Sequence, residues 1–297
     1  MRFNQGALEA HHFNLPIVDH HAHLRHDPSS MEAVKRFESL GGSHIFLATQ
    51  NYGPDVPLSI EDYRSQYETT LAIVRSIAKE TTVQAFPVLA PYPVDLVRVA
   101  PRLGLARAVE LQGAALDLAG KYVQEGLAVA LGEVGRAHFD VPGEVRDALR
   151  SVLEHALAVG RDVNCPLVLH TEDLDAGGYA GLAEMARRCG FPASRLVKHY
   201  ACSHLPPELR QGVAPSFLAR KDLVVEVLPD PGPWFLETDY LADPARPGAV
   251  LALETIPRRV AALLRENAQG EGLLERLTIP FVEAPRKVYG LDLQRKD

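Results

Sequence analysis

Cysteine is scarce in this chain of 297 residues, which has three, Cys165, Cys189 and Cys202, without CxxC spacing. An odd number of scattered cysteines argues against a disulfide framework or a thiolate metal site, and fits a reducing compartment. No hydrophobic run approaches the roughly 18 residues of a membrane span. The start of the sequence has no apolar segment of the signal-peptide type. We therefore expect a cytoplasmic protein without a membrane partner, and no feature implies a protein partner.

Positive charge is also in short supply, because 31 Lys and Arg against 38 Asp and Glu give a net charge of −7. That balance argues against a protein that coats nucleic acid, although it is compatible with a local basic patch. With 46% hydrophobic residues, the chain is neither disordered nor fibrous. Histidine is abundant by contrast: there are 12, and five fall within the first 23 residues.

Short apolar runs alternate with longer amphipathic stretches along the whole chain. Most runs are apolar throughout, as expected for strands that a parallel sheet buries on both faces. The eight candidate strands are 15–24, 44–49, 83–90, 127–135, 166–171, 195–200, 213–219 and 234–239. The candidate helices are 30–42, 59–80, 108–126, 144–160, 178–190, 220–230, 254–269 and 274–291. Ser30 and Ser59 are the expected N-caps of the first two helices.

This alternation predicts an α/β fold, a (β/α)8 TIM barrel in one domain over residues 1–297. The stretch 274–291 would be an extra C-terminal helix. A doubly wound open sheet is the alternative, but no glycine-rich phosphate loop follows the first strand. The segment 220–230 is ambiguous, since LVVEVL would pass for a strand, and we assign it to the helix after strand seven.

Potential metal ligands lie at or near the C-terminal ends of five of the eight runs. In a β/α barrel these ends converge on the active site. The ligand candidates are His21, His23, Glu133, His170, His199 and Asp239. On strand one, alternation would point Asp19, His21 and His23 one way and His20 the other. Asp19 would then accept the outer N–H of a ligand histidine.

Each candidate also has a simpler interpretation. His170 and His199 taken singly are more often core or loop histidines than ligands, and Asp239 could be a helix N-cap. His11, His12 and His20 are assigned to surface or packing. Glu133 is the most constrained, because a buried carboxylate costs several kcal/mol unless it is paired or binds a cation. Together, four imidazoles and two carboxylates suit one or two ions, Zn²⁺ or Mn²⁺ rather than Mg²⁺.

The ordered motifs resemble those of the TatD-related branch of the metal-dependent amidohydrolase superfamily. They are HxH on strand one, GEVG on strand four, PLVLH on strand five, a histidine on strand six and ETD on strand eight. The terminal VEAPRKVYGLD resembles that family's closing helix. The resemblance implies two divalent ions (Zn, Mn or Mg), with His21 and His23 on the first and His170 and His199 on the second. Glu133 would bridge the ions, and Asp239 would complete the coordination of the first ion and orient or deprotonate the attacking water.

Several positions depart from that family's pattern. The His-Pro-His signature of strand three is absent, and the usual arginine after strand five is missing. Arg136 follows GEVG, where it could bind a phosphate or be a solvated surface arginine. Lys198 is expected in an ion pair outside the barrel; a carbamylated lysine bridging the metals is the minor alternative. His204 has no assigned role.

These observations predict a divalent-metal-dependent hydrolase in which a metal-activated water attacks the substrate. Glu133 and Asp239 are the expected catalytic residues, with Arg136 as a candidate substrate contact. By resemblance the substrate is a phosphodiester, so a deoxyribonuclease is the leading interpretation and DNA a candidate substrate. A lactonase, amidase or phosphotriesterase on the same site is the first alternative. A barrel that binds metal without turnover is the second.

Overall fold

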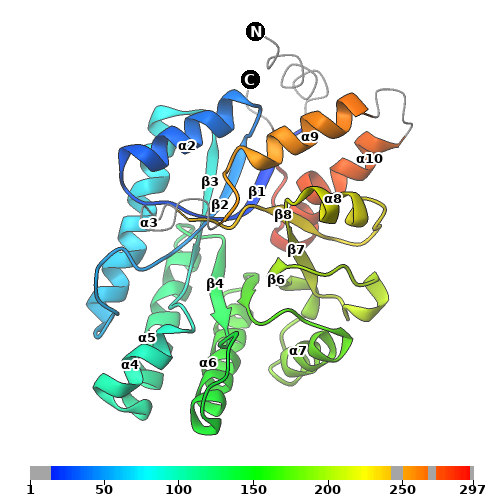
Figure 1. Ribbon diagram of the computed structural model, residues 1–297. Coiled ribbons are helices and arrows are strands. Elements are labelled where there is room, and N and C mark those ends of the chain that lie inside the picture. The colour runs from blue at the N-terminus through cyan, green and yellow to red at the C-terminus, as the bar shows by residue number, and fades with distance from the viewer. Residues whose placement is uncertain (1–14, 242–249, 267–271, 295–297) are drawn as a thin grey trace.

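One curled parallel sheet organises the protein. The computed structural model describes residues 15–241, 250–266 and 272–294. Within these ranges the strands are hydrogen-bonded in the order β8-β7-β6-β5-β4-β3-β2-β1-β9. Their bounds are β1 Val18–His23, β2 His44–Ala48, β3 Gln84–Leu89, β4 Ala130–Gly135, β5 Leu167–His170, β6 Leu196–Ala201, β7 Ala214–Leu218, β8 Phe235–Glu237 and β9 Tyr240–Leu241. The helices lie around the strands (Figure 1), as the predicted barrel requires.

The helices follow the predicted order with one addition, α4. They are α2 Pro28–Ser39, α3 Ile60–Glu80, α4 Asp95–Leu103, α5 Leu105–Gln124, α6 Gly143–Asp162, α7 Ala176–Arg188, α8 Lys221–Val227, α9 Thr255–Glu266 and α10 Leu273–Thr278. Short helical turns are η1 Ala193–Arg195, η2 Pro207–Leu209, η3 Ile279–Glu283 and η4 Pro285–Tyr289. Helix α4 was not predicted; it contains Pro101, although proline disfavours a helix interior. Between β6 and β7, where no helix was predicted and every residue is described, only the short η2 occurs.

The two predicted N-caps had different outcomes. Ser59 caps α3 in a capping box: its hydroxyl accepts from the Asp62 amide at 3.2 Å, and the Asp62 carboxylate accepts from the Ser59 amide at 2.9 Å. The Ser30 prediction was wrong, because α2 begins earlier, at Pro28, with Asp27 as its cap. Proline suits the first helical position, and the Asp27 carboxylate accepts from the Ser30 amide at 2.8 Å.

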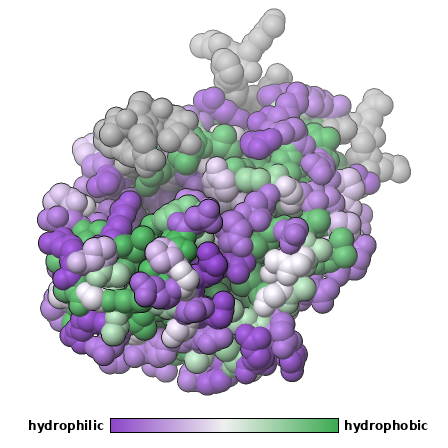
Figure 2. All heavy atoms as spheres, turned by 60° about the horizontal axis from the view of Figure 1, so that its bottom comes forward, coloured by the Kyte–Doolittle hydropathy of each residue, from purple (hydrophilic) through white to green (hydrophobic). Residues whose placement is uncertain are grey.

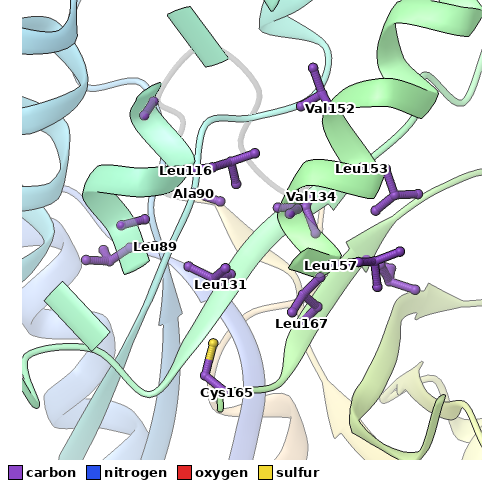
Figure 3. Close-up of a cluster of buried hydrophobic side chains, with 14 of the residues drawn as sticks. Leu89, Ala90, Leu116, Leu131, Val134, Val152, Leu153, Leu157, Cys165 and Leu167 are labelled. Carbon is purple, nitrogen blue, oxygen red and sulfur yellow. The ribbon is translucent and has the colours of Figure 1, made fainter. Parts of the chain in front are cut away.

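Apolar side chains fill the space between the sheet and its covering helices. Figure 3 shows part of this core, where Leu131 of β4 and Leu167 of β5 meet Leu116 of α5 and Leu157 of α6. All four are at most 2% exposed. This packing supplies most of the hydrophobic stabilisation and fixes where the strands end, and so where the candidate ligands lie.

His20 packs inside the barrel, contrary to the expected alternation along β1. Its Nε2 lies 2.7 Å from the Tyr289 hydroxyl and its Nδ1 lies 3.1 Å from the Ser216 hydroxyl on β7. The ring also stacks on Phe235 of β8, with centroids 4.0 Å apart. A register shift between Asp19 and Ala22 lets both His20 and His21 face inward. His20 is thus a packing residue, while His11 and His12 lie outside the described residues.

The barrel closes where the chain leaves β8 and returns to β1. β8 pairs with β7, and β9 pairs with β1 in the register Ala22↔Tyr240 and His23↔Leu241. Asp19 joins the two sides: its carboxylate accepts from the Thr238 amide at 3.1 Å and from the Thr238 hydroxyl at 2.5 Å. The expected bond from Asp19 to a ligand-histidine ring is therefore wrong. Burial raises the pKa of Asp19 to about 7, although these hydrogen bonds lower it.

Among the described residues, no helix is both long and apolar enough to cross a membrane. Figure 2 shows one face of the molecule, on which hydrophobic areas are interrupted by hydrophilic residues.

Replacing Thr238 with valine tests the closure, because valine keeps the shape but removes the hydroxyl that donates to Asp19. We expect Thr238→Val to lower the free energy of unfolding by about 1–3 kcal/mol, measured by urea denaturation. Thr69→Val is the matched control, since the Thr69 hydroxyl donates to the Ser65 carbonyl on the surface of α3. The control should change stability by less than about 0.5 kcal/mol. Equal effects of the two substitutions would contradict the closing role of this bond.

Candidate metal centre

The structure brings together all six side chains that the sequence singled out as candidate ligands. They come from β1, β4, β5, β6 and the residue before β9, and all point into the mouth of the barrel. His21 Nε2 lies 3.4 Å from Glu133 Oε1 and 3.8 Å from Asp239 Oδ1. His199 Nε2 lies 2.7 Å from Glu133 Oε1, and His170 Nδ1 lies 3.3 Å from the same oxygen.

Glu133 is shared by two groups of donor atoms. One group is His21, His23 and Glu133, and the other is Glu133, His170 and His199; within each, the donor atoms lie within 4.8 Å of one another. A third group joins His21 and His199 to Asp239. Every group of potential ligands found in the described part of the chain belongs to this cluster. Glu133 is therefore the carboxylate that the first two groups have in common.

Two glycines give Glu133 its position at the end of β4. A Cβ on Gly132 would lie 2.7 Å from the Val168 side chain on β5. A Cβ on Gly135 would lie 2.0 Å from the His170 carbonyl oxygen, and its φ of +146° is one that other residues rarely adopt. The GEVG motif therefore lets β4 and β5 approach closely, which sets Glu133 beside His170.

The charge of Glu133 is held in place by the surrounding imidazoles. Burial alone would raise the pKa of the carboxyl, but the charge of His199 and hydrogen bonds from His170, His199 and His21 outweigh it and keep the pKa well below its usual range. His199 shows the reciprocal effect: burial would lower its pKa, but the Glu133 and Glu237 carboxylates raise it to about 10. Without a metal ion, a proton on His199 thus compensates the buried carboxylates.

The hydrogen bond that one ring nitrogen of an imidazole makes determines which ring nitrogen faces the cluster. His23 Nδ1 donates to the Ala48 carbonyl at 3.2 Å, so its Nε2 carries a lone pair. That nitrogen lies 3.1 Å from His21 Nε2. On the other side, His170 Nδ1 and His199 Nε2 are also 3.1 Å apart. Imidazole nitrogens that converge in this way are well arranged to share a cation, and the donor set fits Zn²⁺ or Mn²⁺.

Residues outside the predicted set support His170 and His199. The Tyr92 hydroxyl lies 3.3 Å from His170 Nε2, and His138 Nδ1 lies 2.9 Å from the same atom. Buried Glu237 places Oε1 3.4 Å from His199 Nδ1, at ion-pair distance but not aligned for a hydrogen bond. A carboxylate behind an imidazole is a common arrangement at metal sites. Sequence reasoning missed Glu237, although a carboxylate inside the apolar run 234–239 was a usable signal.

Asp239 lies at the opening of the cluster, with a side chain 18% exposed. Its amide donates to the His21 carbonyl at 3.0 Å, so the barrel closure holds it beside β1. Burial raises the pKa of Asp239 to about 6, although His199 and His21 lower it. A carboxylate with that pKa can exchange a proton near neutral pH.

The remaining sequence candidates lie outside the cluster. Lys198 is buried, and its ammonium donates to the carbonyls of His199 and Tyr200; no described carboxylate forms the expected ion pair with it. His204 Nε2 lies 2.8 Å from the buried Asp230 carboxylate. Arg136 forms a two-point ion pair with Glu172, at 2.7 and 3.0 Å, beside the site.

Comparison with known proteins identifies the family. A family model described as TatD related DNase matches residues 18–283. The chain belongs to this family. Its match spans β1 to η3 and so includes every element that carries a candidate ligand.

Proteins similar to this chain come from an archaeon and from a bacterium. The chain is 27% identical over 287 residues to a Methanocaldococcus jannaschii protein described as uncharacterized protein MJ1127, covering 95% of this chain and 98% of that one. The TatD homologue YjjV from Escherichia coli superposes with a TM-score of 0.61 at 16% identity, covering 93% of this chain and 98% of that one.

Two further solved structures share the fold. The phosphotriesterase homology protein of Escherichia coli, complexed with phosphate in its active site, has a TM-score of 0.61 at 13% identity, covering 93% of this chain and 99% of that one. A phosphotriesterase-like lactonase variant from Deinococcus radiodurans has a TM-score of 0.59 at 15% identity, covering 93% and 96%. At these identities the likenesses establish the barrel alone.

Metal loading should release a proton from His199. Its pKa of about 10 keeps it protonated at pH 7.5, and a ligand nitrogen must be unprotonated. We expect Zn²⁺ binding at pH 7.5 to release about one proton per chain, measured by titration calorimetry in buffers of different ionisation enthalpy. His199→Gln should abolish the release, whereas His155→Gln, which alters an exposed surface histidine, should preserve it. Zinc binding without proton release would contradict this charge assignment.

Proposed function

We propose that this protein is a divalent-metal-dependent phosphodiesterase of the deoxyribonuclease type. The observation that carries the proposal is the pair of donor groups that share Glu133 at the mouth of the barrel. Bound divalent ions would supply Lewis acidity to the scissile phosphate and lower the pKa of water from 15.7 toward about 7. The chain's own residues then hold the charge, orient the attacking group and move the proton.

In this proposal His21 and His23 would hold one ion, His170 and His199 would hold the other, and Glu133 would be available to both. Two ions of Zn²⁺ or Mn²⁺ fit the imidazole-rich donor set better than Mg²⁺. Glu237 behind His199 and the Ala48 carbonyl behind His23 fix the orientation of those imidazoles. A barrel that binds metal without turnover is disfavoured, because the candidate ligand set is complete and open to solvent at Asp239.

Asp239 is the proposed general base. It is the more exposed of the two carboxylates of the cluster, and its pKa of about 6 leaves it mostly ionised at pH 7. It can take a proton from the attacking water and pass it to the leaving group. Activity should therefore fall on acidification, because the protonated carboxyl of Asp239 no longer accepts a proton.

The phosphodiester assignment rests on the family and on the charge of the site. The family is described as TatD related DNase, and phosphate occupies the active site of the similar Escherichia coli barrel. Two divalent ions would offset the local carboxylates and attract an anionic substrate despite the net charge of −7. The free cysteines support a reducing compartment, and we place the protein in the cytoplasm on that ground.

A lactone or another carboxylic ester is the second candidate substrate. The same donor set would polarise a carbonyl, and Arg136, the cation expected to meet a phosphate, is engaged by Glu172.

A substrate panel separates the two candidates. The metal-loaded protein is assayed with single-stranded DNA, a chromogenic phosphodiester and a simple lactone, each with and without chelator. We expect hydrolysis of both phosphodiesters and its loss with chelator. Turnover of the lactone alone would overturn the nuclease assignment but leave the site intact.

Asp239→Asn tests the proton step. The amide keeps the size of the side chain but cannot accept the proton, so we expect kcat on the chromogenic phosphodiester to fall by about 10²–10⁴. Asp222→Asn, which alters an exposed aspartate paired with Arg220, is the control and should leave kcat unchanged. DNA cleavage that survives both chelation and Asp239→Asn would contradict the mechanism.

A further inference from the structure

The loop after β4, residues 136–141, contacts the candidate ligand His170 in two ways. The Arg136 amide donates to the His170 carbonyl at 2.9 Å. His138, two residues further on, places its Nδ1 2.9 Å from His170 Nε2. The two imidazole rings meet edge-on, with centroids 5.0 Å apart and an angle of 66° between their planes. The loop therefore holds His170 both by its backbone and by its ring.

Neighbouring residues fix the loop in turn. The Arg136 guanidinium pairs with the Glu172 carboxylate at 2.7 and 3.0 Å, and Glu172 follows His170 by two residues. The Phe139 ring contacts His138 edge-on, with ring centroids 5.2 Å apart. His138 is exposed, yet it packs against the rings of both Phe139 and His170. Its position is thus set by its neighbours, as it must be in a side chain that orients another one.

The outer nitrogen of His170 needs a hydrogen-bond acceptor if this residue binds a cation. His170 Nδ1 faces the cluster, 3.1 Å from His199 Nε2 and 3.3 Å from Glu133 Oε1. A nitrogen that binds a cation presents a lone pair, so the hydrogen of the neutral ring then lies on Nε2. Two groups lie near that hydrogen, His138 Nδ1 at 2.9 Å and the Tyr92 hydroxyl at 3.3 Å. His138 is the nearer acceptor.

The two groups of candidate ligands differ in what orients their imidazoles. His23 Nδ1 donates to the carbonyl of Ala48, a buried residue of β2, and no substitution of a side chain removes that acceptor. The nearest acceptor for His170 Nε2 is instead an exposed side chain on a loop. Altering His138 therefore changes the surroundings of one group of ligands and leaves the other as it is.

We propose that His138 is a positioning residue for the ion that His170 and His199 would hold. Its Nδ1 accepts the hydrogen of His170 Nε2, which fixes the tautomer and the ring orientation in which His170 Nδ1 offers its lone pair to the cation. Partners of this kind typically change metal affinity by about 10–100-fold. The inference rests on the two-ion centre of the proposed function, and it assigns a role to a residue outside the ligand set.

The test measures zinc affinity without any substrate. Zn²⁺ is titrated into the metal-free protein in competition with a chromogenic chelator, so that both binding constants are obtained. In His138→Ala we expect one constant to fall by about 10–100-fold and the other to stay unchanged. His138→Asn should restore most of the loss, because the amide oxygen lies where Nδ1 was and accepts the same hydrogen. His155→Ala, which alters an exposed histidine paired with Asp117, should change neither constant.

Anomalous scattering shows which position has lost its zinc. Crystals of His138→Ala grown at limiting Zn²⁺ should have lower occupancy beside His170 and His199, and the occupancy of the unaltered protein beside His21 and His23.

The outcomes separate this inference from the proposed function. Unchanged constants in His138→Ala, a loss beside His21 and His23 instead, or a loss that His138→Asn does not restore would overturn the positioning role. Selective loss in a protein that hydrolyses no phosphodiester would support the role and overturn the proposed function. An unaltered protein that binds no zinc would overturn both.

Discussion

A buried carboxylate requires positive charge around it, and the architecture of this barrel meets that requirement at Glu133. Burial opposes the charge of Glu133, yet the surrounding imidazoles hold its pKa well below the usual range. In the described structure that compensation comes from a proton on His199, whose pKa is about 10. A divalent cation satisfies the same electrostatic demand with more charge, and it binds the imidazole nitrogen in place of the proton. The candidate metal centre is therefore the arrangement that the buried charge of Glu133 favours.

The closure of the barrel determines which side chains can join Glu133. Hydrogen bonds from Thr238 to Asp19, and from the Asp239 amide to the His21 carbonyl, join the chain after β8 to β1. They bring Asp239 beside His21 and His23, although over 200 residues separate them in sequence. Stability and function are coupled here, because the same contacts complete the sheet and place the proposed general base.

Much of the fold and of the cluster follows from local sequence patterns. Apolar runs predicted the buried strands, and the rule that strand C-termini converge was enough to select the six candidate ligands. What sequence reasoning missed depends on three-dimensional packing. A register shift in β1 turned His20 inward, and the barrel closure took Asp19 away from the histidine rings. The Lys198 ammonium donates to backbone carbonyls. Glu237 faces His199 only because β6 and β8 are both neighbours of β7 in the sheet.

In the proposed metal centre, two divalent ions would occupy the barrel mouth on either side of Glu133. Crystals grown with Zn²⁺ or Mn²⁺ and measured at the absorption edge of the metal test it most directly. We expect two anomalous peaks about 3.5–4 Å apart, one beside His21 and His23 and the other beside His170 and His199. Absence of both peaks in crystals of the folded protein, or metal bound only away from these side chains, would contradict the account.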